Sequence, residues 1–273
     1  MLDYLKYIIL GLIQGITEVL PISSSGHLIM FEKIFNIHNN NLSFEVFLHL
    51  ASLISILLFL SKDIKRLINS FFKYLFKKDE NSYDDFKYIM FLIISTMPIV
   101  FVTILLKNYL NNINKLYIVG ICLIINSIMI YIFSFNSETI NKKDLKIKHA
   151  VVIGLFECLG IFPGISRSGS TISGANVIGL NKKDGAEYSF FLFIPTILGA
   201  VVLEGNNLIQ IFSLEKNLFI CYLLAFITTI FTTYFSFKFL LKIIKKGKLK
   251  YFSLYCLTIG IIVLIYSIIN NFI

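Results

Sequence analysis

The chain has 273 residues, of which 56% are hydrophobic and only 15% are charged, and its mean hydropathy is +0.79. These values exclude an ordinary soluble protein and predict a polytopic membrane protein without a separate soluble domain of any size. The formal net charge of +9 does not indicate nucleic-acid binding. The lysines cluster in short segments between apolar runs, where membrane topology accounts for them.

The first predicted element, Tyr4–Phe35, is an apolar region that is broken by the polar loop Pro21–His27. Pro21 cannot continue a helix, and the serines after it are favourable N-caps for a second helix. A polar break is tolerated at membrane depth only where it is buried in protein or lines a water-filled cavity. The region therefore predicts a re-entrant hairpin, residues 4–35, whose amides and hydroxyls form an anion site.

Six longer apolar stretches predict membrane-spanning helices. They are Phe44–Leu60, Phe86–Leu106, Leu116–Phe135, Tyr188–Val202, Leu218–Leu241 and Tyr251–Ile269. Between the third and the fourth stretch lies a second interrupted region, residues 149–180, with its own Pro-, Gly- and Ser-containing loop, Phe162–Thr171. We predict a second re-entrant hairpin there.

The distribution of lysines predicts how these elements are oriented. Ser61–Asp85, Asn136–Lys148 and Lys242–Lys250 read as lysine-rich loops, whereas the loops Lys107–Lys115 and Glu204–Asn217 are lysine-poor. Cytoplasmic loops carry the excess of Lys and Arg in membrane proteins. The sequence therefore predicts the three lysine-rich loops in the cytoplasm and both termini outside.

The two interrupted regions repeat each other. Under a shift of 143 positions two motifs coincide: Gly11–Gln14 with Gly154–Glu157, and Ile22–Gly26 with Ile165–Gly169. Each half, 1–135 and 149–270, thus holds one hairpin and three spans, and an odd number of spans gives the halves opposite orientations. We predict an all-α integral membrane protein, one membrane domain over 1–273, with six transmembrane helices and two re-entrant hairpins in an inverted-topology repeat whose loops meet.

Acidic and amide side chains precede the first loop. Gln14 and Glu18 are four residues apart and share one helix face, so both can approach the same ion. A carboxylate within an apolar helix is costly and is usually functional or paired. We interpret the pair as ligands of a divalent metal such as Mg²⁺ or Ca²⁺. The alternative is a structural carboxylate that is bonded to the neighbouring serines.

The first loop also contains a nucleophile and a proton acceptor. Ser23, Ser24 and Ser25 taken singly are explained as helix caps, but His27 follows Ser24 by three residues. A serine and a histidine in one dry loop supply the two groups that nucleophilic catalysis requires. No third residue that would orient His27 is visible in the sequence.

The second loop carries an arginine. Arg167 stands between Ser166 and Ser168 at a predicted helix start, and its planar fork matches phosphate oxygens. An arginine inside the membrane is expensive unless it pairs, so an ion pair with a buried glutamate is the alternative. Glu45 and His49 share another helix face. Two roles are equally open for them: bracing the hairpins, or direct participation in the reaction. Together these groups are sufficient for phosphoryl transfer, which depends on positioning and charge stabilisation.

These residues resemble a known family. Two motifs carry the resemblance: Gly15-x-x-Glu18-x-x-Pro21-x-Ser23-Ser24-x-Gly26-His27 and Pro163-Gly-x-Ser166-Arg167-Ser168-Gly169-x-Thr171. The chain is similar, over almost its whole length, to the bacterial undecaprenyl-pyrophosphate phosphatases of the bacitracin-resistance type. Phe44-Glu45 and the run Ser189-Phe190-Phe191-Leu192-x-x-Pro195 are also similar to that family.

The resemblance implies a multi-pass enzyme of the bacterial plasma membrane that removes the terminal phosphate of undecaprenyl pyrophosphate at the outer face. This reaction recycles the lipid carrier for peptidoglycan synthesis and confers bacitracin resistance. Ser24 would be the nucleophile, His27 its proton partner and Arg167 the phosphate clamp, while Glu18 would hold metal or act as base. The implied substrate-binding residues are Ser23, Ser25, Gly26, Ser166, Ser168, Gly169, Thr171 and Glu45. Gln14 departs from the glutamate that is common in the family.

A second class of function stays open at this stage. Inverted repeats with broken helices are also a transporter design, so the chain is alternatively a non-hydrolytic transporter or flippase of an anionic lipid or phosphate. Ser24 and His27 together favour chemistry. The sequence leaves a homodimer open.

Overall fold

The computed structural model describes residues 2–37, 42–110, 115–135 and 139–272. Within these ranges the fold is helical, without a strand, and one isolated bridge joins Ile140 and Leu180. The elements of the first half are α1 (Leu2–Val19), α2 (Ser24–Ile34), α3 (Leu42–Phe59), α4 (Ser61–Lys77), η1 (Glu80–Ser82), α5 (Tyr83–Leu110) and α6 (Leu116–Phe133). Those of the second half are η2 (Lys142–Asp144), α7 (Ile147–Leu159), α8 (Arg167–Val177), α9 (Lys182–Leu203), α10 (Gly205–Gln210), η3 (Ile211–Ser213), α11 (Lys216–Lys245) and α12 (Lys250–Phe272).

Five helices in the described ranges are long and apolar enough to cross a membrane. They are Glu80–Leu106, Leu116–Phe133, Lys182–Leu203, Lys216–Lys245 and Lys250–Ile269. The predicted span Phe44–Leu60 corresponds to α3, which meets the same criterion only together with α4, from which it is bent by 80°. The all-helical membrane architecture is thus confirmed, and both interrupted regions form a helix, a loop and a second helix.

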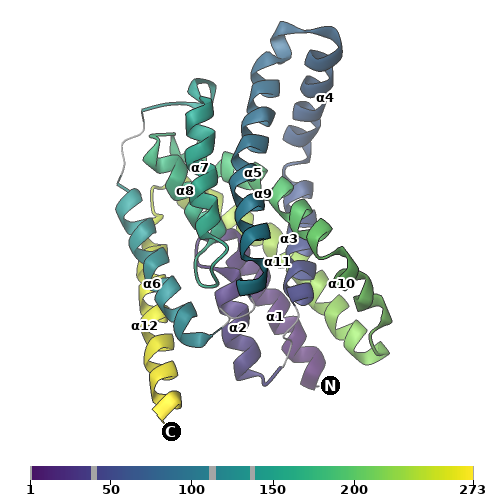
Figure 1. Ribbon diagram of the computed structural model, residues 1–273, viewed down its shortest axis with the longest axis vertical. Coiled ribbons are helices and arrows are strands. Elements are labelled where there is room, and N and C mark those ends of the chain that lie inside the picture. The colour runs from purple at the N-terminus through teal and green to yellow at the C-terminus, as the bar shows by residue number, and fades with distance from the viewer. Residues whose placement is uncertain (1, 38–41, 111–114, 136–138, 273) are drawn as a thin grey trace.

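The lysine-rich segment Ser61–Asp85 differs from its prediction as a loop, since most of it is helix α4. The reason is an apolar repeat of three and four residues that includes Leu67 and Phe71 and favours an amphipathic helix. Leu67 is buried, and Phe71 stacks on Phe86 of α5 with ring centroids 5.5 Å apart. α4 and α5 form a hairpin at one end of the molecule, opposite to both termini (Figure 1). Residues 111–114 of the predicted loop Lys107–Lys115 lie outside the described ranges.

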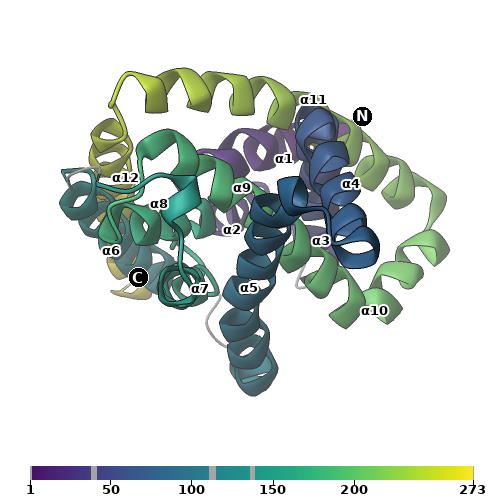
Figure 2. The same ribbon diagram turned by 90° about the horizontal axis from the view of Figure 1, so that it is seen from above.

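The helices of the two halves pair in a matched way. α1 packs on α11 and α7 packs on α5, and α3 contacts α11 as α9 contacts α5. α6 and α12 pair with each other at the side of the bundle (Figures 1 and 2). Two glycines permit the first pairings: a Cβ at Gly11 would lie 2.3 Å from the Ala225 carbonyl oxygen, and one at Gly154 would lie 2.3 Å from that of Ser95.

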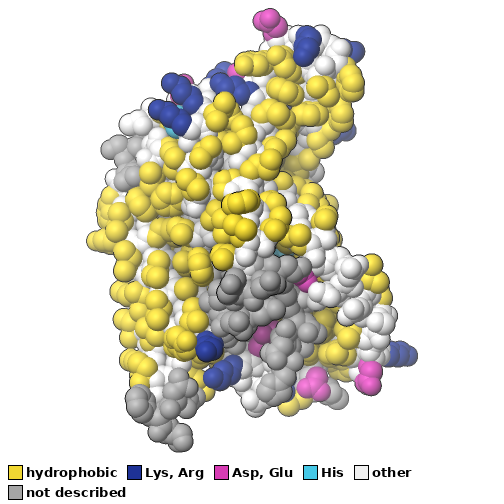
Figure 3. All heavy atoms as spheres, viewed as in Figure 1, with side chains coloured by type: hydrophobic (Ala, Val, Ile, Leu, Met, Phe, Trp, Pro, Cys, Tyr) yellow, Lys and Arg dark blue, Asp and Glu magenta, His cyan; other side chains and the backbone are white. Residues whose placement is uncertain are grey.

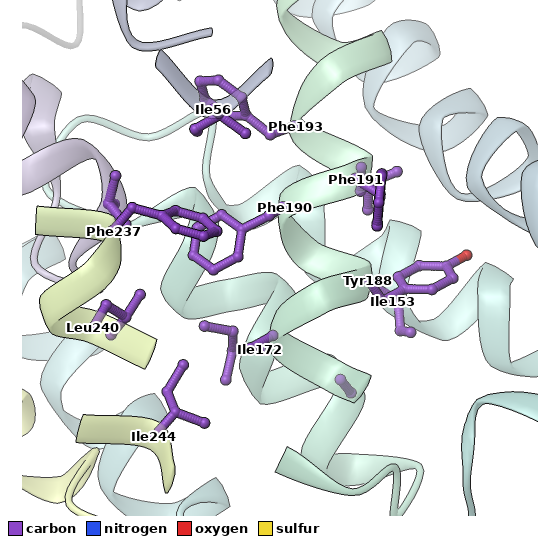
Figure 4. Packing of buried hydrophobic residues seen from close by; sticks show 14 of the residues in the cluster. Ile56, Ile153, Ile172, Tyr188, Phe190, Phe191, Phe193, Phe237, Leu240 and Ile244 are labelled. Carbon is purple, nitrogen blue, oxygen red and sulfur yellow. The ribbon is translucent and has the colours of Figure 1, made fainter. Parts of the chain in front are cut away.

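The core lies around α9, which supplies more buried aromatic rings than any other helix of the described residues: Tyr188, Phe190, Phe191 and Phe193. Phe190 packs edge-on against Phe237 of α11 with ring centroids 4.4 Å apart. The Tyr188 hydroxyl is 2.7 Å from Ser95 Oγ on α5. Figure 4 shows Phe190 and Phe237 packed together, with Ile172 of α8 nearby. α9 thereby ties the second loop region to both halves of the bundle.

Candidate active site

The two polar loops meet, as the sequence predicts. Ser23 Oγ accepts a hydrogen bond from the Gly164 amide at 3.1 Å. Asn126 of α6 joins the loops from the side, because its Nδ2 donates to the Pro21 carbonyl and its Oδ1 accepts from the Ser166 amide, each at 3.1 Å. Contacts of this kind satisfy backbone groups that have no helical partner. Specific hydrogen bonds therefore hold the two loops against each other.

A cavity of about 550 Å³ lies beside this junction. One group of polar lining residues comes from α1, both loops and α3: Glu18, Ser23, Ser24, Ser25, Ser166, Arg167, Glu45 and His49. Apolar residues of α5 and α9, among them Ile99 and Ile197, form another part of the wall, and the polar Asn207 and Gln210 of α10 also line it. The cavity thus combines a polar end with an apolar side, as a ligand with a charged head and an apolar tail requires.

Glu18 is the centre of the polar end, with a side chain that is almost fully buried. Ser24 Oγ donates to Glu18 Oε2 at 2.6 Å, and Gln14 Nε2 donates to the same oxygen at 2.9 Å. His49 Nδ1 lies 2.8 Å from Oε2, while Arg167 Nη2 pairs with Oε1. One carboxylate therefore holds the candidate nucleophile, His49, the Arg167 guanidinium and the Gln14 amide together.

Arg167 keeps part of its hydrogen-bonding capacity free. Its guanidinium lies 4.0 Å from the centre of the Phe193 ring, which fixes the plane of the fork. Nη2 is committed to Glu18, but Nη1 is buried and has no hydrogen-bond partner among the described residues. A buried donor without a partner is costly and marks a position where a ligand is expected. Because Arg167 lines the cavity, a phosphate oxygen is a suitable acceptor.

His27 does not lie where the sequence interpretation requires it. Its Nδ1 contacts the Ser23 carbonyl oxygen at 2.7 Å, and its Nε2 contacts the Tyr255 hydroxyl of α12 at 2.8 Å. Both ring nitrogens are therefore occupied away from the Ser24 hydroxyl, and His27 does not line the cavity. The acceptor at Ser24 is Glu18 instead.

Ser23 and Ser166 also support the turns, and four other motif residues do so without lining the main cavity. Ser23 Oγ accepts from the Gly26 amide at 3.3 Å, and Ser166 Oγ accepts from the Gly169 amide at 3.1 Å. Ser168 Oγ donates to backbone carbonyls of α1, and Thr171 Oγ1 donates to the Arg167 carbonyl at 3.1 Å. Gly26, Ser168, Gly169 and Thr171 therefore shape the loops, whereas Ser25 lines the cavity.

Sequence reasoning left His49 undecided and did not find Tyr255. The Glu45–His49 spacing of one helical turn was the available signal for His49, whose Nε2 lies 3.6 Å from Glu45 Oε1. Nothing in the sequence connects Tyr255 with His27, because the two residues are 228 positions apart. Phe193, which carries the Arg167 guanidinium, was likewise not predicted.

The oxygen donors limit which metal the site suits. No group of three or more His, Cys, Asp and Glu residues within the described ranges has the arrangement of a metal site. Glu18 faces the cavity, and Gln14 Oε1 behind it is buried without a hydrogen-bond partner in those ranges. A hard cation that takes most of its ligands from phosphate oxygens needs only one or two from protein. Glu18, with Gln14 behind it, is therefore where such a cation would be held.

Known proteins are similar to this chain over almost its whole length. Residues 7–262 match the family described as "Bacitracin resistance protein BacA". The undecaprenyl-diphosphatase of Oceanobacillus iheyensis is 38% identical over 263 residues, which cover 95% of each chain. Undecaprenyl-diphosphatase 3 of Bacillus anthracis is 38% identical over 96% of this chain and 97% of its own length. The undecaprenyl-diphosphatase of Methanosphaera stadtmanae is 37% identical over 98% of this chain and 100% of its own. The chain belongs to the BacA family of bacitracin resistance proteins.

Proposed function

We propose that this membrane protein hydrolyses undecaprenyl diphosphate to undecaprenyl phosphate and inorganic phosphate, which recycles the carrier for cell-wall synthesis and confers bacitracin resistance. The observation that carries the proposal is the Ser24 hydroxyl, which donates to a carboxylate that Arg167 holds from the other side. The names of the relatives supply the substrate class.

The chemistry follows from the contacts of Ser24. Its Oγ attacks the terminal phosphorus while its proton passes to Glu18 Oε2, and the bond to the bridging oxygen breaks to release the lipid monophosphate. Water then cleaves the phosphoserine and regenerates the hydroxyl. Arg167 Nη1 donates to an oxygen of the transferring group, where charge shifts as the bond breaks. His49 and Gln14 hold Glu18 in place, and His27 takes no proton from Ser24.

The proposal includes a divalent ion, Mg²⁺ or Ca²⁺, at Glu18 with Gln14 behind it. When bound, such an ion neutralises charge on the diphosphate. The support is the buried oxygen of Gln14 that lacks a partner in the described ranges and the carboxylate beside it.

The test is phosphate release by the purified protein in lipid vesicles that contain undecaprenyl diphosphate. Wild type should release phosphate, and Ser24→Ala should lose turnover by a factor on the order of a thousand or more, because the nucleophile is gone. Ser24→Ala should still bind the substrate. Turnover near that of wild type in Ser24→Ala would point to direct attack by water. The mass of the purified protein gives the number of chains in each assembly and tests a homodimer.

A transporter or flippase remains the second candidate, because the matched pairs α1–α11 and α7–α5 are consistent with the inverted repeat that we propose. The same vesicles distinguish the two functions. Movement of the lipid between leaflets without phosphate release would replace the enzyme proposal with the transporter.

We propose further that the chain has six spans and two re-entrant hairpins in a bacterial plasma membrane, with the cavity open to the outer face. Basic side chains gather over the α4–α5 end in Figure 3, whereas the cavity reaches α10 near the end where the termini lie (Figure 1). In a background without the native cysteines, Asn81→Cys should react only from the cytoplasm and Asn206→Cys only from outside. The reverse pattern would contradict this orientation.

A further inference from the structure

We propose that Tyr255 of α12 is a positioning residue for the reaction. Its hydroxyl fixes His27 as the neutral ring that carries hydrogen on Nδ1, and His27 in turn holds Ser23 in the conformation that presents Ser24 to Glu18. The inference rests on the proposed function for its activity readout, whereas its structural readout is independent of any substrate.

The backbone of Ser23 needs such support. Ser23 has φ 71° and ψ 102°, a conformation that side-chain-bearing residues rarely adopt. Ser166, which occupies the equivalent position in the second loop, makes the same N-cap contact with an ordinary φ of −77° and ψ of 122°. The cap itself therefore does not impose the unusual conformation of Ser23, and another interaction must hold it.

The second loop also shows what is special about His27. Ser170, the repeat equivalent of His27, donates its hydroxyl to the Ser166 carbonyl at 2.9 Å. His27 makes the corresponding bond to the Ser23 carbonyl at 2.7 Å, but its ring has a second nitrogen that reaches out to Tyr255 at 2.8 Å. At this position the first loop is thus tied to a distant helix, whereas the Ser170 hydroxyl bonds within its own loop.

Hydrogen-bond directions determine the state of the ring. A carbonyl oxygen only accepts, so the contact with Ser23 requires hydrogen on Nδ1. In the neutral ring Nε2 is then an acceptor, and the Tyr255 hydroxyl must donate to it. Without this donor Nε2 is a buried acceptor that lacks a partner, which is costly, and the ring loses one of the two contacts that hold it against the Ser23 carbonyl. Tyr255 therefore acts on Ser23 through His27.

Packing makes the arrangement rigid. The His27 ring is 3% exposed and stacks on the Tyr255 ring with centroids 5.7 Å apart and planes inclined by 10°. Asn126 Nδ2, which bonds the Pro21 carbonyl, also donates to Cys256 Sγ next to Tyr255 at 3.3 Å. The α6–α12 pair thus contacts both the beginning and the end of the loop.

Tyr255→Phe is the direct test, because Tyr255 is 40% exposed and phenylalanine keeps its ring. With full-length protein in vesicles that contain undecaprenyl diphosphate, we expect kcat to fall about tenfold, the scale of one lost hydrogen bond, and KM to stay the same. Tyr266→Phe, three turns further along α12 with Tyr266 49% exposed, is the matched control and should have wild-type activity. Unchanged kcat in Tyr255→Phe would overturn the proposal.

A double-mutant cycle separates this role from simple helix packing. His27→Asn retains a donor for the Ser23 carbonyl but does not reach Tyr255. If Tyr255 acts through His27, adding Tyr255→Phe to His27→Asn should lower kcat no further. Effects that multiply would show that Tyr255 supports the fold independently of His27, and would overturn the proposal.

Nitrogen NMR of labelled protein reports the ring state without any turnover. The chain has four histidines, so His27 can be assigned by comparison with the His27→Asn variant. Wild type should show hydrogen on Nδ1 of His27 and a hydrogen-bonded Nε2, and Tyr255→Phe should shift the Nε2 signal toward that of an acceptor without a partner. Hydrogen on Nε2 in wild type would refute the inference even if the phosphatase assay succeeds. Absence of phosphate release with the expected ring state would instead count against the proposed function alone.

Discussion

The two loops that meet at the site have the same construction but different chemistry. In each, a serine caps the following helix by accepting from a glycine amide three residues on, at 3.3 Å for Ser23 and 3.1 Å for Ser166. The next residue is Ser24 in the first loop and Arg167 in the second. The same local structure thus presents a hydroxyl in one loop and a cation in the other.

The preceding helices differ in the same complementary way. Glu18 stands before the first loop, while its repeat equivalent in the second half is the apolar Ile161. Gln14 corresponds to Glu157, a buried carboxyl that accepts from Thr196 Oγ1 at 2.7 Å. The acid of the first copy therefore faces the cation of the second. The two loop regions thus contribute complementary residues to one site.

Arg167→Lys gives the largest effect among the changes that break this complementarity. Lysine keeps one positive charge but loses the planar fork that joins Glu18 to a phosphate oxygen. We expect kcat for phosphate release to fall about a hundredfold, the scale of one lost preorganised transition-state donor. Arg66→Lys changes the other arginine of the chain, at an exposed ion pair with Asp85, and should leave kcat unchanged. Near-normal turnover of Arg167→Lys would show that the second loop only supports the fold.

The caps allow a comparison of stability between the loops. Ser23 Oγ accepts from the amides of Gly26 and Gly164, whereas Ser166 Oγ accepts from one loop amide, that of Gly169. Ser23→Ala should therefore destabilise the fold by about 2 kcal/mol and Ser166→Ala by about 1 kcal/mol. Unfolding midpoints in the same detergent measure both. A larger loss for Ser166→Ala would show that the second loop carries more of the junction.

Gln14→Glu should give the smallest effect. A second carboxylate behind Glu18 strengthens the attraction for a divalent ion, so the concentration of Mg²⁺ at half-maximal activity should fall severalfold. Glu157→Gln, which removes the carboxyl at the equivalent position of the second copy, should leave that concentration unchanged. Activity that is insensitive to a chelator in both proteins would contradict a metal at Glu18.

Much of this arrangement could be predicted because its signals are local. Polar residues in two apolar regions at a constant spacing indicated paired loops, and the polar face of Gln14 and Glu18 indicated a site. The position of His27 could not be predicted, because it depends on Tyr255, which only the fold brings near. The contact between His49 and Glu18 depends on packing of α1 against α3 in the same way.

The helix α4 shows a different kind of error. Its lysines suggested a loop, although the apolar repeat that includes Leu67 and Phe71 was present in the same segment. The spacing of apolar residues is a stronger indicator of helix than the number of charged residues. The membrane side assigned to this segment does not depend on that error, since a basic helix and a basic loop follow the same charge rule.

The ion pair between Arg167 and Glu18 has a consequence for product inhibition. Arg167 already holds an anion that belongs to the protein through Nη2, so an incoming phosphate binds Nη1 beside a carboxylate that repels it. We expect free phosphate and soluble pyrophosphate to bind poorly. A diphosphate anchored in the bilayer is concentrated at the cavity by its lipid tail and overcomes this repulsion more readily. The protein would thus release the inorganic phosphate that it forms and continue to hydrolyse its substrate where phosphate accumulates.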